Sequence, residues 1–237
     1  MKNQRNITTT TPPHIGTLNE GSLHASLKHH VSKEGDKFEV PINGYVVDIV
    51  RKSNQTNSIL IEIQTKSFLA MRKKLSSLLD DYQIHIVYPV AKQTVLVKPD
   101  KKPRKSPKKY SVLTIFEELV SIPELITHPN LSFEVIVVSV RKIQQFDPSL
   151  RRRRGGYRTI NTELTEIHST QMFEGVQDFL ALLPKDLPKV FTTSDIASLG
   201  KMSRQTAQQI AYCFRKAGVF HELSHTKKGK HYEIIDL

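Results

Sequence analysis

Two apolar segments in the N-terminal third of the chain follow the spacing of β-strands. They cover residues 45–50 and 59–66, are rich in β-branched residues, and are bounded by Asn43-Gly44 and by a polar stretch at 53–57. Such runs between turn formers predict a β-hairpin. If its loop is symmetric about Gln55, residues equally distant from Gln55 face each other, which pairs Asp48 with Glu62.

Helical spacing flanks this hairpin on both sides. Leu23, Leu27 and Val31 recur at i, i+4 and i+8, and Asn19 stands where the N-cap of that helix is expected. Residues 68–79 have the apolar stripe of an amphipathic helix. Further strands are predicted over 37–42, 83–89 and 93–98, which gives the order α-β-β-β-α-β-β. Beyond them, the pattern predicts a helix over 111–126, a buried strand over 133–140, and a strand or turn over 159–169.

Asp48 and Glu62 lie inside these apolar strands, where charge is expensive. Opposed cross-strand residues have Cβ atoms about 4.5–5.5 Å apart, and like charges there are destabilising. The pair therefore calls for a compensating cation or a raised pKa, and a hard divalent metal meets that need. The alternative is a half-buried hairpin whose acids form solvated salt bridges with Arg51, Lys52 or Lys66.

This arrangement resembles the PD-(D/E)XK nuclease superfamily. The matching residues are Glu20 at the start of the first helix, Asp48, and Glu62-Ile63-Gln64, and the resemblance covers about residues 16–98. It implies an α/β fold of the restriction-endonuclease type, with a mixed sheet flanked by helices. It also implies Mg²⁺ (or Mn²⁺) held by Asp48, Glu62 and the carbonyl of Ile63, with Glu20 nearby, and hydrolysis of a phosphodiester.

The chain departs from the superfamily pattern at Gln64, which occupies the usual lysine position. A glutamine carries no charge and is no base, but active relatives with glutamine there belong to what the resemblance implies. We expect the Gln64 amide oxygen to orient the attacking water. Lys66 shares the strand face of Glu62 and Gln64 by period-2 alternation, so we expect it to supply the missing cation to the scissile phosphate.

The C-terminal residues 176–237 look like a winged helix-turn-helix. A Thr/Ser cap before Asp195 begins a short helix, Gly200-Lys201-Met202 forms a turn, and Ser203 caps a longer helix that Gly218 closes. The buried stripe of that helix comprises Ala207, Ile210, Ala211, Phe214 and Ala217. A β-hairpin follows, with Thr226-Lys227-Lys228-Gly229 as its loop.

A recognition helix of this kind enters the major groove of DNA. The candidate DNA-binding residues are Ser203, Arg204, Gln205, Gln208 and Gln209 on the helix, which suit base edges, and Lys227, Lys228 and Lys230 on the wing, which suit phosphates. Winged helices also serve as protein-interaction or dimerisation modules, so the fold alone leaves both uses open.

The 237 residues contain 35 Lys and Arg against 23 Asp and Glu, a net charge of +12. This balance favours polyanionic partners such as double-stranded or branched DNA. The charge concentrates in a Lys/Pro run at 98–109, predicted as an extended basic loop, and in a loop at 150–158 that contains Arg151, Arg152, Arg153 and Arg154 beside two glycines. Both runs suit either backbone contact or a solvated connector.

These patterns divide the chain into a disordered tail at 1–14, a nuclease-like domain at 15–170 and a winged-helix domain at 176–237. One cysteine, Cys213, excludes a disulfide framework. Neither a membrane span nor a signal peptide is predicted, so a cytoplasmic setting is expected, with a homodimer left open. The ten histidines lack the spacing of zinc ligands.

Two function classes follow. The first is a metal-dependent DNA endonuclease that a winged helix delivers to its substrate, with RNA as a weaker substrate alternative. The second is a catalytically inactive DNA-binding or regulatory protein on a nuclease-like fold. Retention of Asp48 and Glu62 in apolar strands favours the first, because buried charges cost stability unless they are used.

Overall fold

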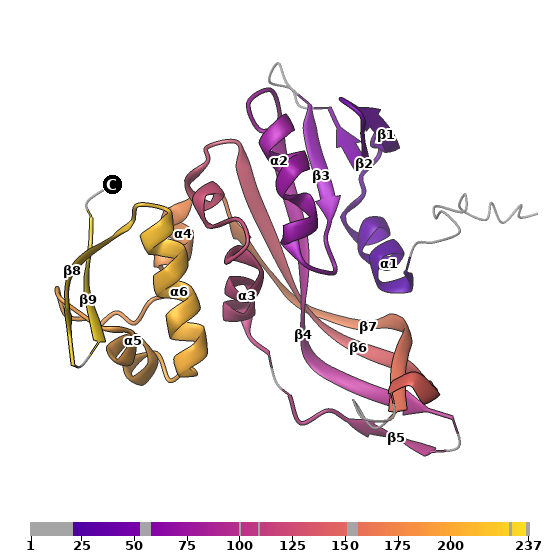
Figure 1. Ribbon diagram of the computed structural model, residues 1–237. Coiled ribbons are helices and arrows are strands. Elements are labelled where there is room, and N and C mark those ends of the chain that lie inside the picture. The colour runs from indigo at the N-terminus through magenta and orange to yellow at the C-terminus, as the bar shows by residue number, and fades with distance from the viewer. Residues whose placement is uncertain are drawn as a thin grey trace, which may run out of the picture.

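The computed structural model describes residues 21–52, 58–99, 101–108, 110–150, 156–227 and 229–235. Its centre is a mixed seven-stranded sheet in the order β1-β2-β3-β4-β6-β7, with β5 paired to the end of β4 (Figure 1). The three middle strands β3, β4 and β6 run parallel, and the remaining pairings are antiparallel. The strands are β1 (Lys37–Ile42), β2 (Tyr45–Arg51), β3 (Ile59–Ile63), β4 (Gln83–Lys98), β5 (Lys101–Lys105), β6 (Leu131–Phe146) and β7 (Tyr157–Phe173).

Helices cover both faces of the sheet. Helix α1 (Ser22–Val31) places Leu27 in a core with Ile49, Ile61 and the first half of β6 on one face. The other face is covered by η1 (Phe68–Met71), α2 (Arg72–Leu78) and the short turns η2 (Val112–Ile115), α3 (Phe116–Leu119) and η3 (Pro123–Thr127). The predicted α/β class with a mixed, helix-flanked sheet is therefore confirmed at that level.

Several predicted boundaries were wrong. The strands expected at 83–89 and 93–98 are one strand, β4, because its irregularity between Ala91 and Gln93 leaves the pairing with β6 intact. The basic run at 98–109 is no free loop, since its residues Lys101–Lys105 form edge strand β5, where a proline is tolerated. Residues 111–126 are three short helical turns, as Pro123 ends the continuous pattern.

The first helix also begins later than expected. Its N-cap is Gly21, which makes no side-chain capping bond, so Asn19 is not the cap. Both Asn19 and the tail at 1–14 lie outside the described residues. No helix in the described parts of the chain is long and apolar enough to cross a membrane.

The C-terminal part contains α4 (Val176–Leu180), α5 (Thr193–Leu199) and α6 (Arg204–Lys216), followed by strands β8 (Phe220–Thr226) and β9 (Gly229–Ile234). Thr192 and Asp195 form a capping box at α5, and the Ser203 hydroxyl accepts the Thr206 N–H at α6. Gly218 ends α6 with a φ of 75°, which favours glycine. A bridge from Phe191 to Tyr232 ties the start of this unit to β9.

The C-terminal unit shares its core with the sheet. Phe116 of α3 packs edge-on against Phe214 of α6, with 5.7 Å between ring centroids, and Phe179 of α4 meets both Phe116 and Phe133. Cys213 is fully buried at the same junction, and burial raises the pKa of its thiol to about 12. A fragment cut near residue 175 would expose these aromatic rings to water on both sides of the cut.

Candidate functional site

The candidate site lies where β2 and β3 part. Ile49 pairs with Ile61, Val50 with Leu60 and Arg51 with Ile59, so the predicted symmetry of the hairpin about Gln55 is confirmed. The last pair of this ladder is Ile49 with Ile61, and Asp48, which precedes Ile49 in the chain, lies just beyond it. At that point the Asp48 carboxylate accepts the main-chain N–H of Ile63 at 2.8 Å. A side chain therefore replaces a backbone bond between the strands.

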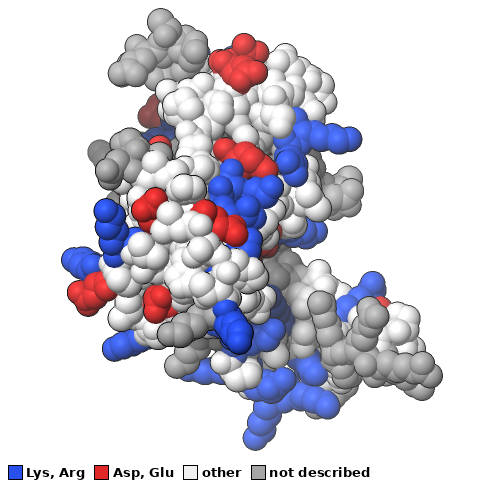
Figure 2. Space-filling view, turned by 60° about the vertical axis from the view of Figure 1, so that its left-hand side comes forward, with Lys and Arg blue, Asp and Glu red and all other residues white. Residues whose placement is uncertain are grey.

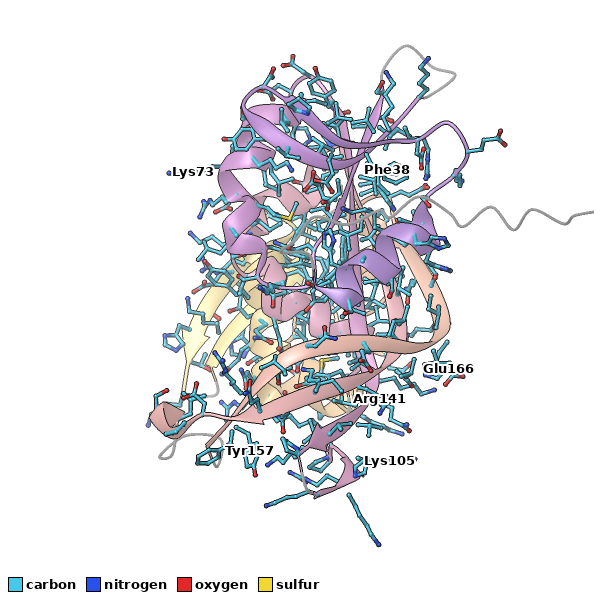
Figure 3. All side chains as sticks on the ribbon, turned by 90° about the vertical axis from the view of Figure 1, so that its right-hand side faces the viewer. Phe38, Lys73, Lys105, Arg141, Tyr157 and Glu166 are labelled. Atoms are coloured by element: carbon cyan, nitrogen blue, oxygen red, sulfur yellow. The ribbon has the colours of Figure 1, made fainter. Side chains whose placement is uncertain are left out.

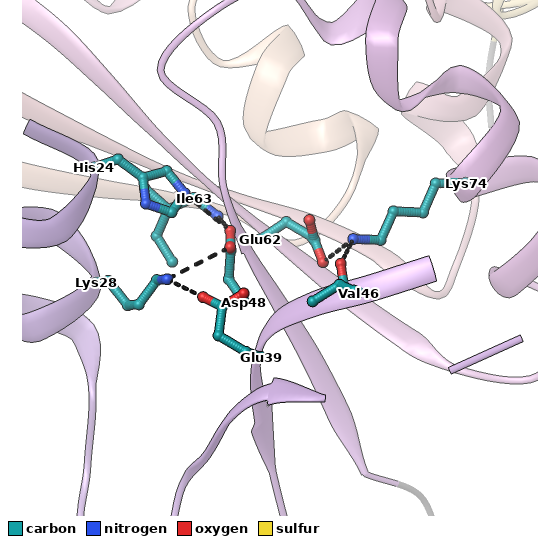
Figure 4. Close-up of polar contacts among 8 residues, drawn as sticks. All are labelled: His24, Lys28, Glu39, Val46, Asp48, Glu62, Ile63 and Lys74. Atoms are coloured by element: carbon teal, nitrogen blue, oxygen red, sulfur yellow. Dashed lines mark hydrogen bonds and ion pairs between the residues drawn. The ribbon is translucent and has the colours of Figure 1, made fainter. Parts of the chain in front are cut away.

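Asp48 is held from the α1 side of the sheet (Figure 4). His24 Nε2 lies 3.2 Å from Asp48 Oδ2, and Lys28 Nζ lies 3.8 Å from Oδ1. Burial alone would raise the pKa of Asp48, but the hydrogen bonds from His24 and Ile63 and the charge of Lys28 hold it below its ordinary value. Asp48 is therefore ionised at neutral pH.

Glu62 is held from the α2 side instead. Its Oε1 accepts Lys74 Nζ at 2.5 Å, and the same ammonium group donates to the Val46 carbonyl at 2.6 Å. Burial, together with the nearby charge of Asp48, raises the pKa of Glu62 to about 7 against the opposing charge and hydrogen bond of Lys74. The two acids thus titrate far apart, a pattern typical of carboxylates with different roles.

The two carboxylates lean toward helices on different faces of the sheet, which differs from the expected shared metal cage. Within the described residues, no group of three or more His, Cys, Asp or Glu side chains is placed to hold a metal ion. The donor chemistry of Asp48, Glu62 and the Ile63 carbonyl still fits a hard divalent cation, since all are oxygens. Binding by both acids requires Lys74 to release Glu62, because the ammonium group occupies that oxygen.

Of the other expected catalytic residues, the structure describes Gln64 and Lys66. Gln64 continues the pairing of β3 through its N–H to the Val87 carbonyl, while its amide nitrogen donates to the Ser67 carbonyl at 2.9 Å. Lys66 is exposed in a bend after β3 has ended at Ile63. The expectation that it shares the strand face of Glu62 was wrong, because period-2 alternation stops with the strand. Glu20 lies outside the described residues.

Three residues of the site were missed from the sequence: His24, Lys28 and Lys74. Lys28 is only 1% exposed and also pairs with Glu39, which has a φ of 51° inside β1. The sequence nevertheless contained a signal that could have identified all three. Each lies on the apolar stripe of its amphipathic helix, beside Leu27 in α1 or Leu75 in α2, where a cation is out of place unless it meets a buried acid.

The alternative prediction, in which Asp48 and Glu62 form salt bridges with Arg51, Lys52 or Lys66, also differs from the structure. Arg51 binds Asp36 through two bonds of 2.9 and 2.7 Å, and the acid pair uses Lys28 and Lys74. The pairs at Asp48 and Glu62 are largely buried rather than solvated, so their charges interact strongly.

The residues predicted to form a recognition helix have an exposed face. Ser203, Arg204, Gln205 and Gln208 are exposed and Gln209 is half-buried, whereas Ala207, Ile210, Ala211 and Phe214 are buried as predicted. Ala217 is half-buried. In the hairpin, Lys227 is exposed and Lys230 bonds Glu222 at 2.9 Å. Lys228 and the block Arg151, Arg152, Arg153 and Arg154 lie outside the described residues.

A cleft of about 630 Å³ lies away from the acid pair, beside the N-terminal ends of the parallel strands β3, β4 and β6. In it, His85 bonds Ser132 through Nδ1 at 2.9 Å and Glu134 through Nε2 at 3.0 Å. The hydrogen bond from His85 lowers the pKa of Glu134. The order of ring nitrogens is the reverse of the serine-hydrolase arrangement, where Nε2 faces the nucleophile, so the cluster gives no support to acyl transfer.

Comparison with known proteins places the sheet unit in a family. Residues 21–174 match the model of a domain of unknown function, DUF8091. The chain belongs to this family. The DUF8091 match ends immediately before α4 and so excludes the C-terminal unit that contains α4, α5, α6, β8 and β9. An uncharacterized protein of Treponema pallidum (strain Nichols) is 28% identical over 191 residues, 78% of this chain and 74% of the relative. No solved structure matches the chain.

Proposed function

We propose that the protein is a metal-dependent endonuclease that hydrolyses DNA phosphodiester bonds. The observation that carries the proposal is the pair of half-buried Asp48 and buried Glu62 at the parting of β2 and β3, with pKa values displaced in opposite directions. Carboxylates whose pKa values are shifted by burial and by neighbouring charges are common in catalytic sites. The family resemblance of the Asp48…Glu62-Ile63-Gln64 pattern supplies the reaction class.

In this proposal the oxygens of Asp48, Glu62 and Ile63 would hold Mg²⁺ or Mn²⁺ after Lys74 releases Glu62 and that carboxylate turns toward Asp48. When bound, such an ion supplies charge stabilisation at the phosphate and acidifies a water molecule. Glu62, whose pKa burial raises to about 7, would have to lose its proton to hold the ion. Lys74, once released from Glu62, provides a cation at the scissile phosphate, where the lysine slot holds Gln64.

Gln64 orients the attacking water through its amide oxygen, since its amide nitrogen is engaged by Ser67. Positioning carries a large part of such reactions. Gln64→Ala should lower the cleavage rate and leave the DNA dissociation constant unchanged. An undiminished rate would remove Gln64 from the mechanism. Lys66, exposed after the strand, remains a candidate for phosphate contact from the solvent side.

The C-terminal unit delivers DNA to the site in this proposal. Its free α6 face carries Arg204, Gln205 and Gln208 near the helix N-terminus, the part that meets base edges in a helix-turn-helix. The shared core with α3 fixes this face relative to the sheet. Recognition and cleavage would then occur at a set spacing on one duplex.

Incubation of the purified protein with supercoiled plasmid and Mg²⁺ or Mn²⁺ tests the proposal. Wild type should nick or linearise the plasmid, while Asp48→Ala and Glu62→Gln should lose activity. Asp80→Asn is the matched control, because Asp80 is an exposed acid at the end of α2. Equal activity in wild type and Asp48→Ala would show that the cleavage comes from a contaminant and would sink the proposal.

A catalytically inactive DNA-binding protein is the second candidate. It is favoured by the lysines Lys28 and Lys74, which already compensate the acid pair without a metal. In that case Mn²⁺ would leave the thermal midpoint of the wild type unchanged, and DNA binding would be the same in Asp48→Ala. For the nuclease, Mn²⁺ should raise the midpoint of the wild type and have no effect on Asp48→Ala.

A further inference from the structure

Four strands continue past the acid pair and form an arm that extends from the body of the protein. Strand β3 ends at Ile63, level with Val87 of β4, but β4 runs on to Lys98 beside β6 and β7, and β5 folds back onto its end. The arm points away from the helices at the bottom of Figure 1. It is built from hydrogen-bonded strands, so its surface is held in shape.

The surface of the arm is strongly basic. Figure 2 shows Lys and Arg side chains gathered at the lower end of the molecule, where the arm lies. Besides Lys92, the exposed cations on its strands are Lys101, Lys102, Arg104, Lys105, Arg141 and Arg158, with Lys98 and Lys142 half-buried among them.

Acids compensate little of this charge. Arg141 lies 4.0 Å from Glu163, and Arg158 lies 3.7 Å from Asp147. None of these other cations takes part in an ion pair within the part of the chain that the structure describes. Slight burial lowers the pKa of Lys98, and the charges of Lys101 and Arg104 lower it further. Crowded cations of this kind are relieved when an anion binds.

The tip of the arm is an ordered aromatic cluster (Figure 3). Lys98 Nζ lies 3.7 Å from the centroid of the Tyr157 ring, and Phe146 meets that ring edge-on at 5.7 Å. Gly156 has a φ of 77°, and a Cβ there would lie 2.8 Å from the Phe146 ring, so the chain passes close over it. These contacts fix the positions of the cations at the tip.

A cleft of about 230 Å³ lies at the base of the arm, just beyond the end of β3. It is lined by Leu23 of α1, Thr65 after β3, Tyr88 of β4 and Lys142 of β6, among others. From Val87 to Lys98 the strand spans eleven residues, at most about 36 Å at roughly 3.3 Å per residue. That length is close to one turn of B-form DNA, about 34–36 Å.

We propose that the arm binds the phosphate backbone of duplex DNA about one helical turn from the Asp48–Glu62 site. Lys98, Lys101, Arg104 and Lys142 make the contacts, and the duplex crosses the cleft beside Thr65. The assignment of the cleavage site rests on the proposed nuclease function, whereas the binding surface does not. The partner is DNA because hydrogen-bonded strands hold the cations in a fixed array, which a regular line of phosphates can match.

The test compares the wild-type protein with the double variant Lys101→Ala/Arg104→Ala, both as the full chain. Fluorescence anisotropy with a 24-base-pair duplex in EDTA, from 50 to 300 mM salt, measures binding without cleavage. Loss of two phosphate contacts should make the log–log salt slope shallower by about 1.8 and weaken binding about 60-fold at 0.1 M salt. Lys33→Ala/Lys37→Ala is the control, since both lysines are exposed at the far end of the sheet.

The control should keep the wild-type slope. An unchanged slope in the arm variant, or an equal loss in the control, overturns the proposal. Lys98→Ala/Lys142→Ala, which removes the other two proposed contacts, repeats the test should the first variant fail to fold. If poly-L-glutamate or anionic vesicles of phosphatidylserine displace the duplex as well as unlabelled DNA does, the partner is wrong. Plasmid cleavage equal in wild type and Asp48→Ala would end the nuclease proposal alone.

Discussion

The acid pair and the arm each concentrate charge of one sign, but they differ in how that charge is compensated. At the acid pair, half-buried Asp48 and buried Glu62 each have a lysine within reach, and their pKa values shift in opposite directions. On the arm, most cations are exposed and lack an acid partner among the described residues. Buried charge therefore bears on stability and proton transfer, while exposed charge bears on association.

Lys74→Met should have the largest effect. It leaves Glu62 buried without its cation, which costs about 3–5 kcal/mol of unfolding free energy when Glu62 is ionised. Urea denaturation at pH 9 measures this loss, and at pH 5, where Glu62 is protonated, the loss should shrink. The double variant Lys74→Met/Glu62→Gln should recover most of the stability at pH 9. A loss that is equal at both pH values would show that packing, not charge, is responsible.

The pH dependence of stability should come next in size. The pKa of Glu62 rises from 4.5 to about 7 on folding, so the folded state binds more protons between these values. Its contribution is fully present below pH 4.5 and is lost as the pH rises through 7, by about 3 kcal/mol in total. Urea midpoints of wild type and Glu62→Gln across pH 4–9 give the difference. Parallel curves would contradict the burial of an ionisable Glu62.

A third surface, the free face of α6, extends the comparison to sequence readout. Arg204→Ala or Gln208→Ala should cost about 1–3 kcal/mol on duplexes selected from a random pool and less on unselected ones. Lys227→Ala in the hairpin should weaken binding to all sequences and flatten the salt slope by about 0.9. If α6 serves dimerisation instead, sedimentation will show a change in mass while DNA affinity is preserved.

The smallest effect is expected for Lys101→Met on the arm. This lysine is exposed and forms no ion pair in the described part of the chain, so the unfolding free energy should change by less than about 0.5 kcal/mol. Thermal melts of Lys101→Met and Lys74→Met compare the loss of stability from the same substitution on the exposed arm and at the largely buried acid pair. Similar losses in both would erase the distinction between the regions.

The sequence predicted the local features of the site better than its long-range ones. The register that pairs Ile49 with Ile61 followed from a symmetric loop, and the caps and stripe of α6 followed from short-range periodicity. The partners of the acids come from helices packed on different faces, so the direction of each carboxylate depends on tertiary contacts. The arm was missed for a similar reason, since β5 is a strand only because β4 extends beneath it.

Pro103 in β5 has a consequence for how the protein behaves at high concentration. The outermost strands of an open sheet present backbone groups that can pair with another molecule, and a long arm increases that hazard. Proline lacks the N–H that such pairing needs, and the lysines on either side repel a second copy. Pro41 stands in the same way in the edge strand β1. These two strands are thereby guarded against aggregation through added strands.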